Sequence, residues 1–279
     1  MLPYRLAGMW LSLVERSVRD REVVGSNPAI PTRQRRRQAA DRGSAVSVSR
    51  EKAMISEFLH WLGFGLCHQL PERSFFGGGV QVPVCARDEG LYVGFLIAFV
   101  IIWLLHRPRR PRELPGPAAL VVCALFLGSM VVDGVTSYGG IRETTNVIRL
   151  LTGAMAGYSL AALVAPLLND ELWLRADSIR VLSPVWRLVA WALSVPLVVL
   201  IVLYGGPLLG VGYPLAVAAA IIATFLIVNL VLAVMLSPFE RKAQRPRDLL
   251  APLAIALLLT ALEFVLASLL KLGLLALGS

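Results

Sequence analysis

Six long apolar runs constrain this chain more than any other feature of its sequence. A helix that spans a bilayer needs about 20 mostly apolar residues. Runs of roughly this length cover residues 90–105, 117–132, 147–168, 188–209, 213–236 and 249–272. Only 16% of the 279 residues are charged, against about a quarter in soluble domains. The sequence therefore predicts an all-α, polytopic transmembrane bundle of about six spans, with no water-soluble catalytic domain.

A shorter apolar segment at residues 55–66 precedes these runs. It carries Ser56, Glu57 and His60, and it is too short for an ordinary span. Segments of this length form interfacial helices, re-entrant half-helices or unusually short spans. All three interpretations remain open at this point.

Basic loops predict the orientation of the bundle. Lysine and arginine gather in loops 106–112, 169–187 and 237–248, which follow the first, third and fifth runs. Such loops favour the cytoplasmic side, so we expect a multi-pass protein of a prokaryotic inner membrane. Segments 66–89 and 133–146 would then share the extracytoplasmic face, where they could meet.

The first 53 residues differ in character from the rest. They hold 11 of the 27 basic residues and give +6 of the net charge of +9. Residues 25–28 read GSNP, which is the translation of GGT-TCG-AAT-CCC and looks like the T-arm of a transfer-RNA gene. The segment is too polar to form a core. We interpret residues 1–53 as upstream sequence with a start at Met54, or else as a basic tail, and expect no nucleic-acid partner.

Two polar motifs precede the first long run. Residues 67–76 read CHQLPERSFF, and residues 83–94 read PVCARDEGLYVG. Glycines and prolines between them suggest a hairpin that returns Cys85 towards Cys67. Farther along, the chain carries Asp133, Arg142 and the tripeptide LTG at residues 151–153.

This order of motifs resembles a bacterial and archaeal membrane-protein family known as domain of unknown function 2085. The resemblance covers roughly residues 61–158 and implies no particular activity. Many members of that family have Cys-Thr where this chain has Asp88 and Glu89. That difference removes a possible third thiol and weakens a thiolate-cluster interpretation.

Three interpretations compete for the first motif. Cys67, His68, Cys85 and Asp88 could bind a metal, since thiolate, imidazole and carboxylate suit zinc, and sulfur with imidazole also suits copper. Cys67 and Cys85 could instead form a disulfide, which an oxidising outer face permits. The third interpretation is a packed loop without chemistry. Cys123 lies in an apolar run and is expected to be buried.

Charged residues near the ends of the spans form a second candidate group. They are Arg73, Arg87, Asp133, Arg142 and Arg149. They could pair with one another, or an arginine could hold an anionic substrate such as a lipid phosphate. Glu263 lies near the middle of the last run, where a charge is costly. It is either a functional acid or a hydrogen-bonded packing residue.

The spacing of Gly153 and Gly157 allows a close helix contact. Residues 54–168 hold both motifs, and residues 169–279 supply three further spans. The chain lacks Walker, GxSxG, HExxH and dinucleotide-binding motifs. The sequence thus predicts a metal or thiol site at the outer face. A transporter of a small solute or ion, or a membrane assembly protein, is the alternative.

Overall fold

The computed structural model describes residues 50–236, 239, 241 and 243–277. The chain divides into two units, one formed by Met54–Lys271 and the other by Met1–Ala53 with Leu272–Ser279. In the second unit, residues 50–53 and 272–277 are helical. The hypothesis about residues 1–53 falls almost wholly outside the described residues. All that follows concerns Met54–Lys271.

Within the described residues, six helices are long and apolar enough to cross a membrane, which confirms the predicted all-α bundle. Five of the six spans correspond to one helix each. These helices are α3 (Ala86–His106), α4 (Pro117–Tyr138), α5 (Asn146–Leu172), α9 (Gly212–Val234) and α10 (Leu250–Leu277). The fourth span is segmented into α6 (Val185–Leu193), α7 (Val195–Leu200), a π-helical turn η2 (Ile201–Gly205) and α8 (Gly206–Leu208). Residues 54–64 add a further, shorter helix.

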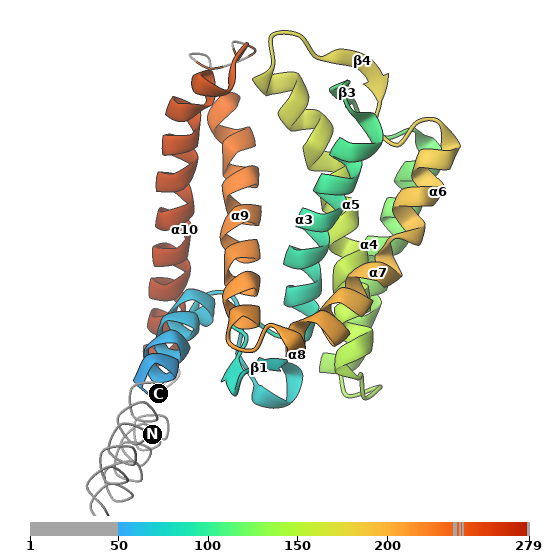
Figure 1. The fold of residues 1–279 in the computed structure, drawn as a ribbon. Helices are drawn as coiled ribbons and strands as arrows, with labels where there is room; N and C mark the ends of the chain where they lie inside the picture. The colour runs from blue at the N-terminus through green and yellow to red at the C-terminus, as the bar shows by residue number, and fades with distance from the viewer. Residues whose placement is uncertain (1–49, 237–238, 240, 242, 278–279) are drawn as a thin grey trace, which may run out of the picture. The chain divides into compact units, whose positions relative to one another are not determined.

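The three basic loops lie together at one end of the bundle. There β3 (Pro111–Glu113) pairs in parallel with β4 (Asp177–Arg180), as Figure 1 shows. The Leu174 N–H donates to the Ala243 carbonyl at 3.1 Å, which ties the second loop to the third. This grouping agrees with the prediction that all three loops share one side of the membrane.

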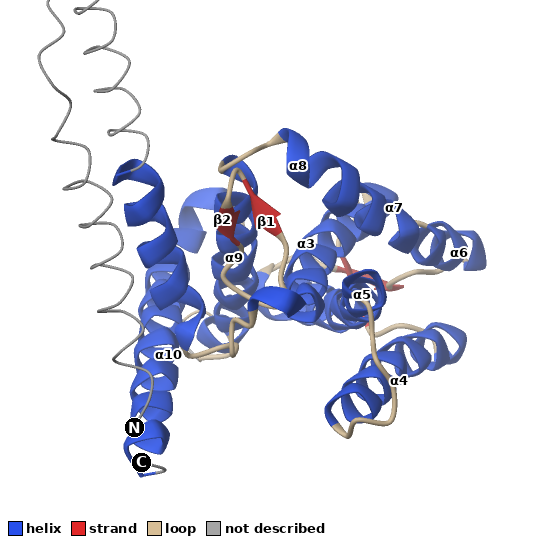
Figure 2. Cartoon of the chain, turned by 90° about the horizontal axis from the view of Figure 1, so that it is seen from below, coloured by secondary structure: helices blue, strands red, loops and turns tan. Residues whose placement is uncertain are grey.

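The opposite end carries a β-hairpin made of β1 (Phe76–Gly77) and β2 (Val80–Gln81). Figure 2 views the bundle from this end. Its turn uses Gly78 and Gly79, at φ +59° and +83°. Side chains strongly disfavour this left-handed region, whereas glycine enters it freely. The hairpin predicted between the two polar motifs is thus present.

Glycines let α3 and α5 approach closely, with α5 lying between α3 and α4 (Figure 2). A Cβ atom added at Gly153 would lie 1.9 Å from the Arg87 carbonyl oxygen, and one at Gly157 would lie 2.2 Å from that of Leu91. On the facing helix, a Cβ at Gly90 would lie 2.2 Å from the Leu150 oxygen. The predicted small-residue contact is confirmed, and its partner is α3.

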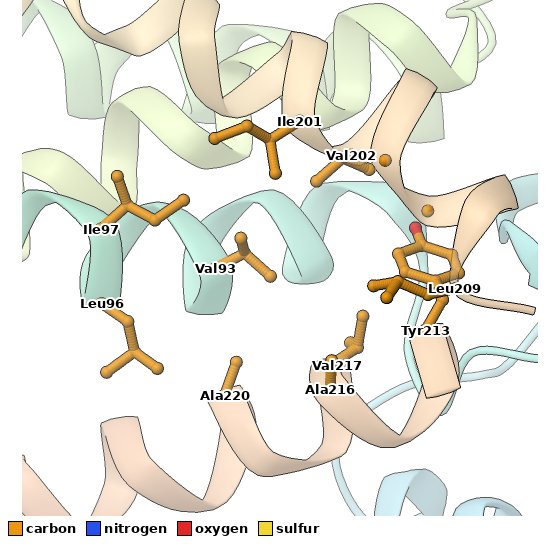
Figure 3. Close-up of a pocket in the computed structure, with 12 residues that line it drawn as sticks. Val93, Leu96, Ile97, Ile201, Val202, Leu209, Tyr213, Ala216, Val217 and Ala220 are labelled. Carbon is orange, nitrogen blue, oxygen red and sulfur yellow. The ribbon is translucent and has the colours of Figure 1, made fainter. Parts of the chain in front are cut away.

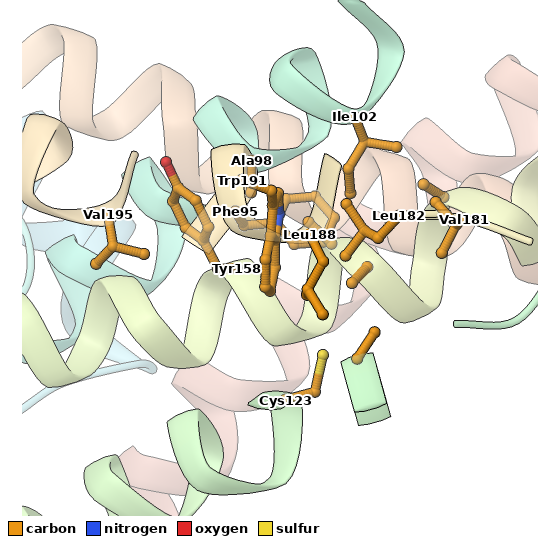
Figure 4. Packing of buried hydrophobic residues seen from close by; sticks show 14 of the residues in the cluster. Phe95, Ala98, Ile102, Cys123, Tyr158, Val181, Leu182, Leu188, Trp191 and Val195 are labelled. Carbon is orange, nitrogen blue, oxygen red and sulfur yellow. The ribbon is translucent and has the colours of Figure 1, made fainter. Parts of the chain in front are cut away.

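An aromatic cluster joins the fourth span to α5 (Figure 4). The buried Trp191 ring lies 5.3 Å from the Tyr158 ring and 5.8 Å from the Phe126 ring, measured between centroids. Cys123 is buried in the same cluster, as predicted. These contacts hold α3, α4, α5 and α6 as one packed group.

Two spans are longer than the hydropathy pattern predicted, because charged residues are part of them. Helix α3 begins at Ala86 rather than near residue 90, and α4 continues to Tyr138 rather than ending near residue 132. Asp88 and Glu89 occupy the first turn of α3, where acidic side chains suit the positive end of the helix dipole. Asp133 can lie inside α4 because Arg87 pairs with it.

Candidate functional site

A glutamine holds the first polar motif against the second. The Gln69 side-chain amide donates to the His60 carbonyl at 3.0 Å and to the Pro83 carbonyl at 2.8 Å. The Gln81 amide donates in turn to the Gln69 carbonyl at 3.0 Å. Gln69 itself adopts φ +54°, an uncommon conformation for a non-glycine residue. This network places the chain before Cys85 beside the chain that follows Cys67.

A lysine from the last span holds the same segment from the other side. Lys271 Nζ donates to the Phe64 carbonyl at 2.6 Å and to the Cys67 carbonyl at 2.8 Å. It also lies 4.5 Å from the Phe64 ring centroid. The ammonium group thereby satisfies carbonyls where the helix at residues 54–64 ends.

The two thiols and one carboxylate meet at the N-terminus of α3. One ligand atom from each of Cys67, Cys85 and Asp88 lies within 4.8 Å of the other two. The Cys85 N–H donates to Cys67 Sγ at 3.3 Å, and Cys85 Sγ lies 3.2 Å from Asp88 Oδ2. All three cysteines of the chain are free thiols in this structure. The hairpin therefore assembles three soft or anionic ligand atoms from residues up to 21 positions apart in the sequence.

A cavity of about 90 Å³ adjoins the thiols. It is lined by Cys67, His68, Gln69, Leu70, Arg73, Cys85 and Tyr138. His68 is exposed and also lines a neighbouring, more polar cavity of about 160 Å³, together with His60. His68 thus lies beside the thiols but outside the group formed by Cys67, Cys85 and Asp88.

The two thiols differ in acidity because they interact with each other. A hydrogen bond from the Cys85 side chain is the main cause that lowers the pKa of Cys67 from 9.0 to about 7, although burial opposes it. The pKa of Cys85 is raised, first by that same hydrogen bond and then by burial. The lowered pKa makes Cys67 the more readily ionised of the two thiols.

In reduced, metal-free protein, we expect the rate of Cys67 alkylation by iodoacetamide to rise with pH around a midpoint near 7. The thiolate is the reactive form, so the rate is low below that pH and levels off above it. Mass spectrometry assigns the alkylated cysteine. Cys85→Ala removes the donor and should move the midpoint upwards, towards 9. A wild-type midpoint near 9 would contradict this assignment.

The predicted charged group divides into separate sets. Asp133 is buried and accepts hydrogen bonds from Arg87 Nε at 3.0 Å, Arg87 Nη2 at 2.5 Å and Arg142 Nη2 at 2.8 Å. The Thr152 hydroxyl lies 3.4 Å from the same carboxylate. This cluster ties α3, α4 and α5 together. Pairing among these residues was one of the alternatives that the sequence left open, and in the structure Arg87 pairs with Asp133.

The remaining members lie in different surroundings. Arg149 Nη1 donates to Asn146 Oδ1 at 2.9 Å. Arg73 lies over the Tyr138 ring, with its Cζ atom 5.2 Å from the ring centroid. Glu263 Oε2 accepts from Asn229 Nδ2 at 2.7 Å, and it is not among the residues that line the thiol cavity. The two polar segments do meet, because the Asn146 amide donates to the Glu72 carbonyl at 3.2 Å.

Sequence reasoning missed three residues that build the site. Lys271 and Glu263 are the charges within α10, so an isolated charge in an apolar helix was the available signal for Lys271. Tyr138 is the last residue of α4, and no motif in the surrounding sequence identifies it as a site residue. Gln69 belongs to the CHQ motif, but its hydrogen bonds to the His60 and Pro83 carbonyls depend on the fold, which the motif alone does not predict.

A second cavity, away from the thiols, has a different character (Figure 3). It measures about 220 Å³, lies between α3, η2 and α9, and is lined by apolar side chains apart from Tyr213. The Tyr213 hydroxyl donates to the buried Glu89 carboxylate. Such a crevice suits an apolar chain and offers few groups for chemistry, so the thiol cavity is the better candidate.

Comparison with known proteins decides the family. Residues 67–163 match the family described as predicted membrane protein (DUF2085). The chain is 33% identical over 108 residues to an uncharacterized protein of Methanocaldococcus jannaschii, an alignment that covers 39% of this chain and 67% of that protein. The chain belongs to this family.

A second uncharacterized protein, from Methanothermobacter thermautotrophicus, is 38% identical over 98 residues, which cover 35% of this chain and 83% of that protein. No solved structure matches the chain. The family match begins at Cys67 and includes α3, α4 and most of α5. The thiol group and the Asp133 cluster therefore lie in the part shared with the family, whereas the last three spans lie outside it.

Proposed function

We propose that this membrane protein binds a metal ion through Cys67, Cys85 and Asp88, and that zinc is the first choice. The observation that carries the proposal is the mutual separation of their ligand atoms, all within 4.8 Å. Tetrahedral zinc with Zn–S bonds of about 2.3 Å needs sulfur atoms about 3.8 Å apart. Ligand atoms within 4.8 Å of one another are close to that spacing.

The neighbouring cavity bears on what such a metal would do. Three protein ligands and an open position are typical of catalytic zinc, whereas structural zinc has four protein ligands. The cavity of about 90 Å³ leaves room for water or a substrate atom beside the thiols. An ion there would act as a Lewis acid or lower the pKa of bound water. Soft thiolates also suit copper(I), so the experiment must identify the metal.

Elemental analysis of the purified full chain tests this proposal. We expect about one metal ion per wild-type chain, loss of the metal in Cys67→Ser and Cys85→Ser, and a reduced content in Asp88→Asn. Cys123→Ser is the matched control, since Cys123 is buried away from the site and should leave the content unchanged. Equal metal content in all five proteins, including zero, would refute the metal site.

A reversible Cys67–Cys85 disulfide is the second candidate, favoured by the same closeness of the two sulfur atoms. The basic loops at the opposite end support an extracytoplasmic position for the pair in a prokaryotic cell membrane. A membrane-impermeant maleimide added to intact cells tests both points. Labelling of Cys67 only after reductant favours the disulfide, and labelling without it favours free thiols. Labelling only after permeabilisation would contradict the proposed face.

A further inference from the structure

Arg73 lines the thiol cavity, and its guanidinium has no carboxylate partner among the described residues. Arg87 and Arg142 share Asp133, and Arg149 donates to Asn146. Arg73 instead rests over Tyr138 and lines the cavity that Cys67 and Cys85 also line. A guanidinium without a carboxylate partner therefore lines the thiol cavity.

The Tyr138 ring holds this charge in place. Arg73 Cζ lies 5.2 Å and Arg87 Cζ lies 5.7 Å from the ring centroid. Guanidinium groups stack favourably on aromatic faces while their N–H donors stay available. Because Arg87 is committed to Asp133, the Arg73 fork is the one available to a ligand.

The size and surroundings of the cavity restrict the ligand. About 90 Å³ is well below the 300–1,000 Å³ of pockets that enclose whole drug-sized molecules. The cavity can hold a head group, with the rest of the molecule outside. Two of its lining residues, Leu70 and Tyr138, are 37% and 64% exposed, so the rim is partly apolar.

We infer that the thiol cavity binds an oxyanion, a phosphate or carboxylate group, through the guanidinium of Arg73. Arginine presents a planar fork that matches two oxygens of such a group. The thiols, or a metal held by them, would then face the bound group. This inference extends the proposed function by naming the ligand class of the same site. It does not require that a metal be bound, so the two can fail separately.

Charged thiol reagents provide a direct test on reduced, chelator-treated full chain in detergent. The probes are the anionic sulfonatoethyl and the cationic trimethylammonioethyl methanethiosulfonates, with modification of Cys67 followed by mass spectrometry. Because Arg73 lines the same cavity as Cys67, we expect the ratio of anionic to cationic modification rates at Cys67 to be about ten times the ratio measured with a small free thiol. A ratio equal to that of the free thiol would overturn the inference.

Arg73→Gln should abolish the preference, and Arg73→Lys should retain most of it because the charge remains. Arg142→Gln is the matched control, since it removes the same charge from a guanidinium that already has a carboxylate partner. We expect its ratio to stay within about twofold of wild type. If Arg73→Gln and Arg142→Gln lower the ratio equally, the effect is general surface charge and the specific role of Arg73 is refuted.

Competition identifies the source of the oxyanion and needs only wild-type protein. Inorganic phosphate should slow Cys67 modification when compared with chloride at equal ionic strength, a comparison that removes general screening. In nanodiscs, anionic phosphatidylglycerol is compared with zwitterionic phosphatidylcholine. Protection by free phosphate supports a small soluble ligand, and protection by the anionic lipid alone supports a lipid head group. Absence of protection in both experiments would overturn oxyanion binding.

Discussion

Gly153→Ala is expected to destabilise the protein by about 3 kcal/mol, the upper end of the usual cost of overpacking. The new Cβ would lie 1.9 Å from the Arg87 carbonyl oxygen on α3. Both atoms belong to or adjoin the backbone, so no side-chain rotation relieves the clash. The two helices must separate, and the contacts of the neighbouring Gly90 and Gly157 are lost with them.

Titration with SDS, followed by circular dichroism, measures this loss of stability. Gly128→Ala is the matched control, since nothing lies within 4 Å of a Cβ atom added there on α4. Alanine also favours a helix over glycine by about 1 kcal/mol. Gly128→Ala should therefore be neutral or stabilising. Equal midpoints for the two variants would show that α3 and α5 are not in close contact.

The transmembrane architecture was predictable because hydropathy reports it directly. The number of long spans, the shared end of the basic loops and the Gly153–Gly157 contact all follow from local sequence, and the structure has them. Helix ends were predicted less well. Hydropathy stops at the first charged residue, whereas α3 and α4 continue through Arg87 and Asp133 because these two side chains neutralise each other.

The candidate site was predictable in its membership more than in its geometry. The motif placed Cys67 and Cys85 together, since glycine and proline between them indicated a hairpin. The motif did not predict that Asp88, rather than His68, would lie close to both thiols, because this depends on where α3 begins. The roles of Tyr138 and Lys271 depend on contacts between distant segments, which periodicity does not reveal.

The Arg87–Asp133 pair is also expected to matter strongly for stability. Asp133→Ala should cost about 3–5 kcal/mol, because it leaves a buried guanidinium without its counterion. Arg87 has a side-chain exposure of 7%, so water cannot replace the lost carboxylate without opening the helix contact. Arg142 also loses a partner, but its side chain is 50% exposed and can turn to solvent. The SDS midpoint of Asp133→Ala should therefore fall well below that of wild type.

Two comparisons separate the burial of charge from a general effect of removing an aspartate. Asp170→Ala breaks pairs with Arg241 and Arg112, at 3.0 and 3.8 Å, and these arginine side chains are 51% and 43% exposed. Such pairs contribute less than about 1 kcal/mol. The double change Arg87→Met with Asp133→Leu removes both charges and should recover most of the loss, since apolar replacements of a buried pair are often neutral or stabilising. If the double variant is as unstable as Asp133→Ala, the pair contributes through shape or through Thr152 and Arg142, and the buried-charge explanation fails.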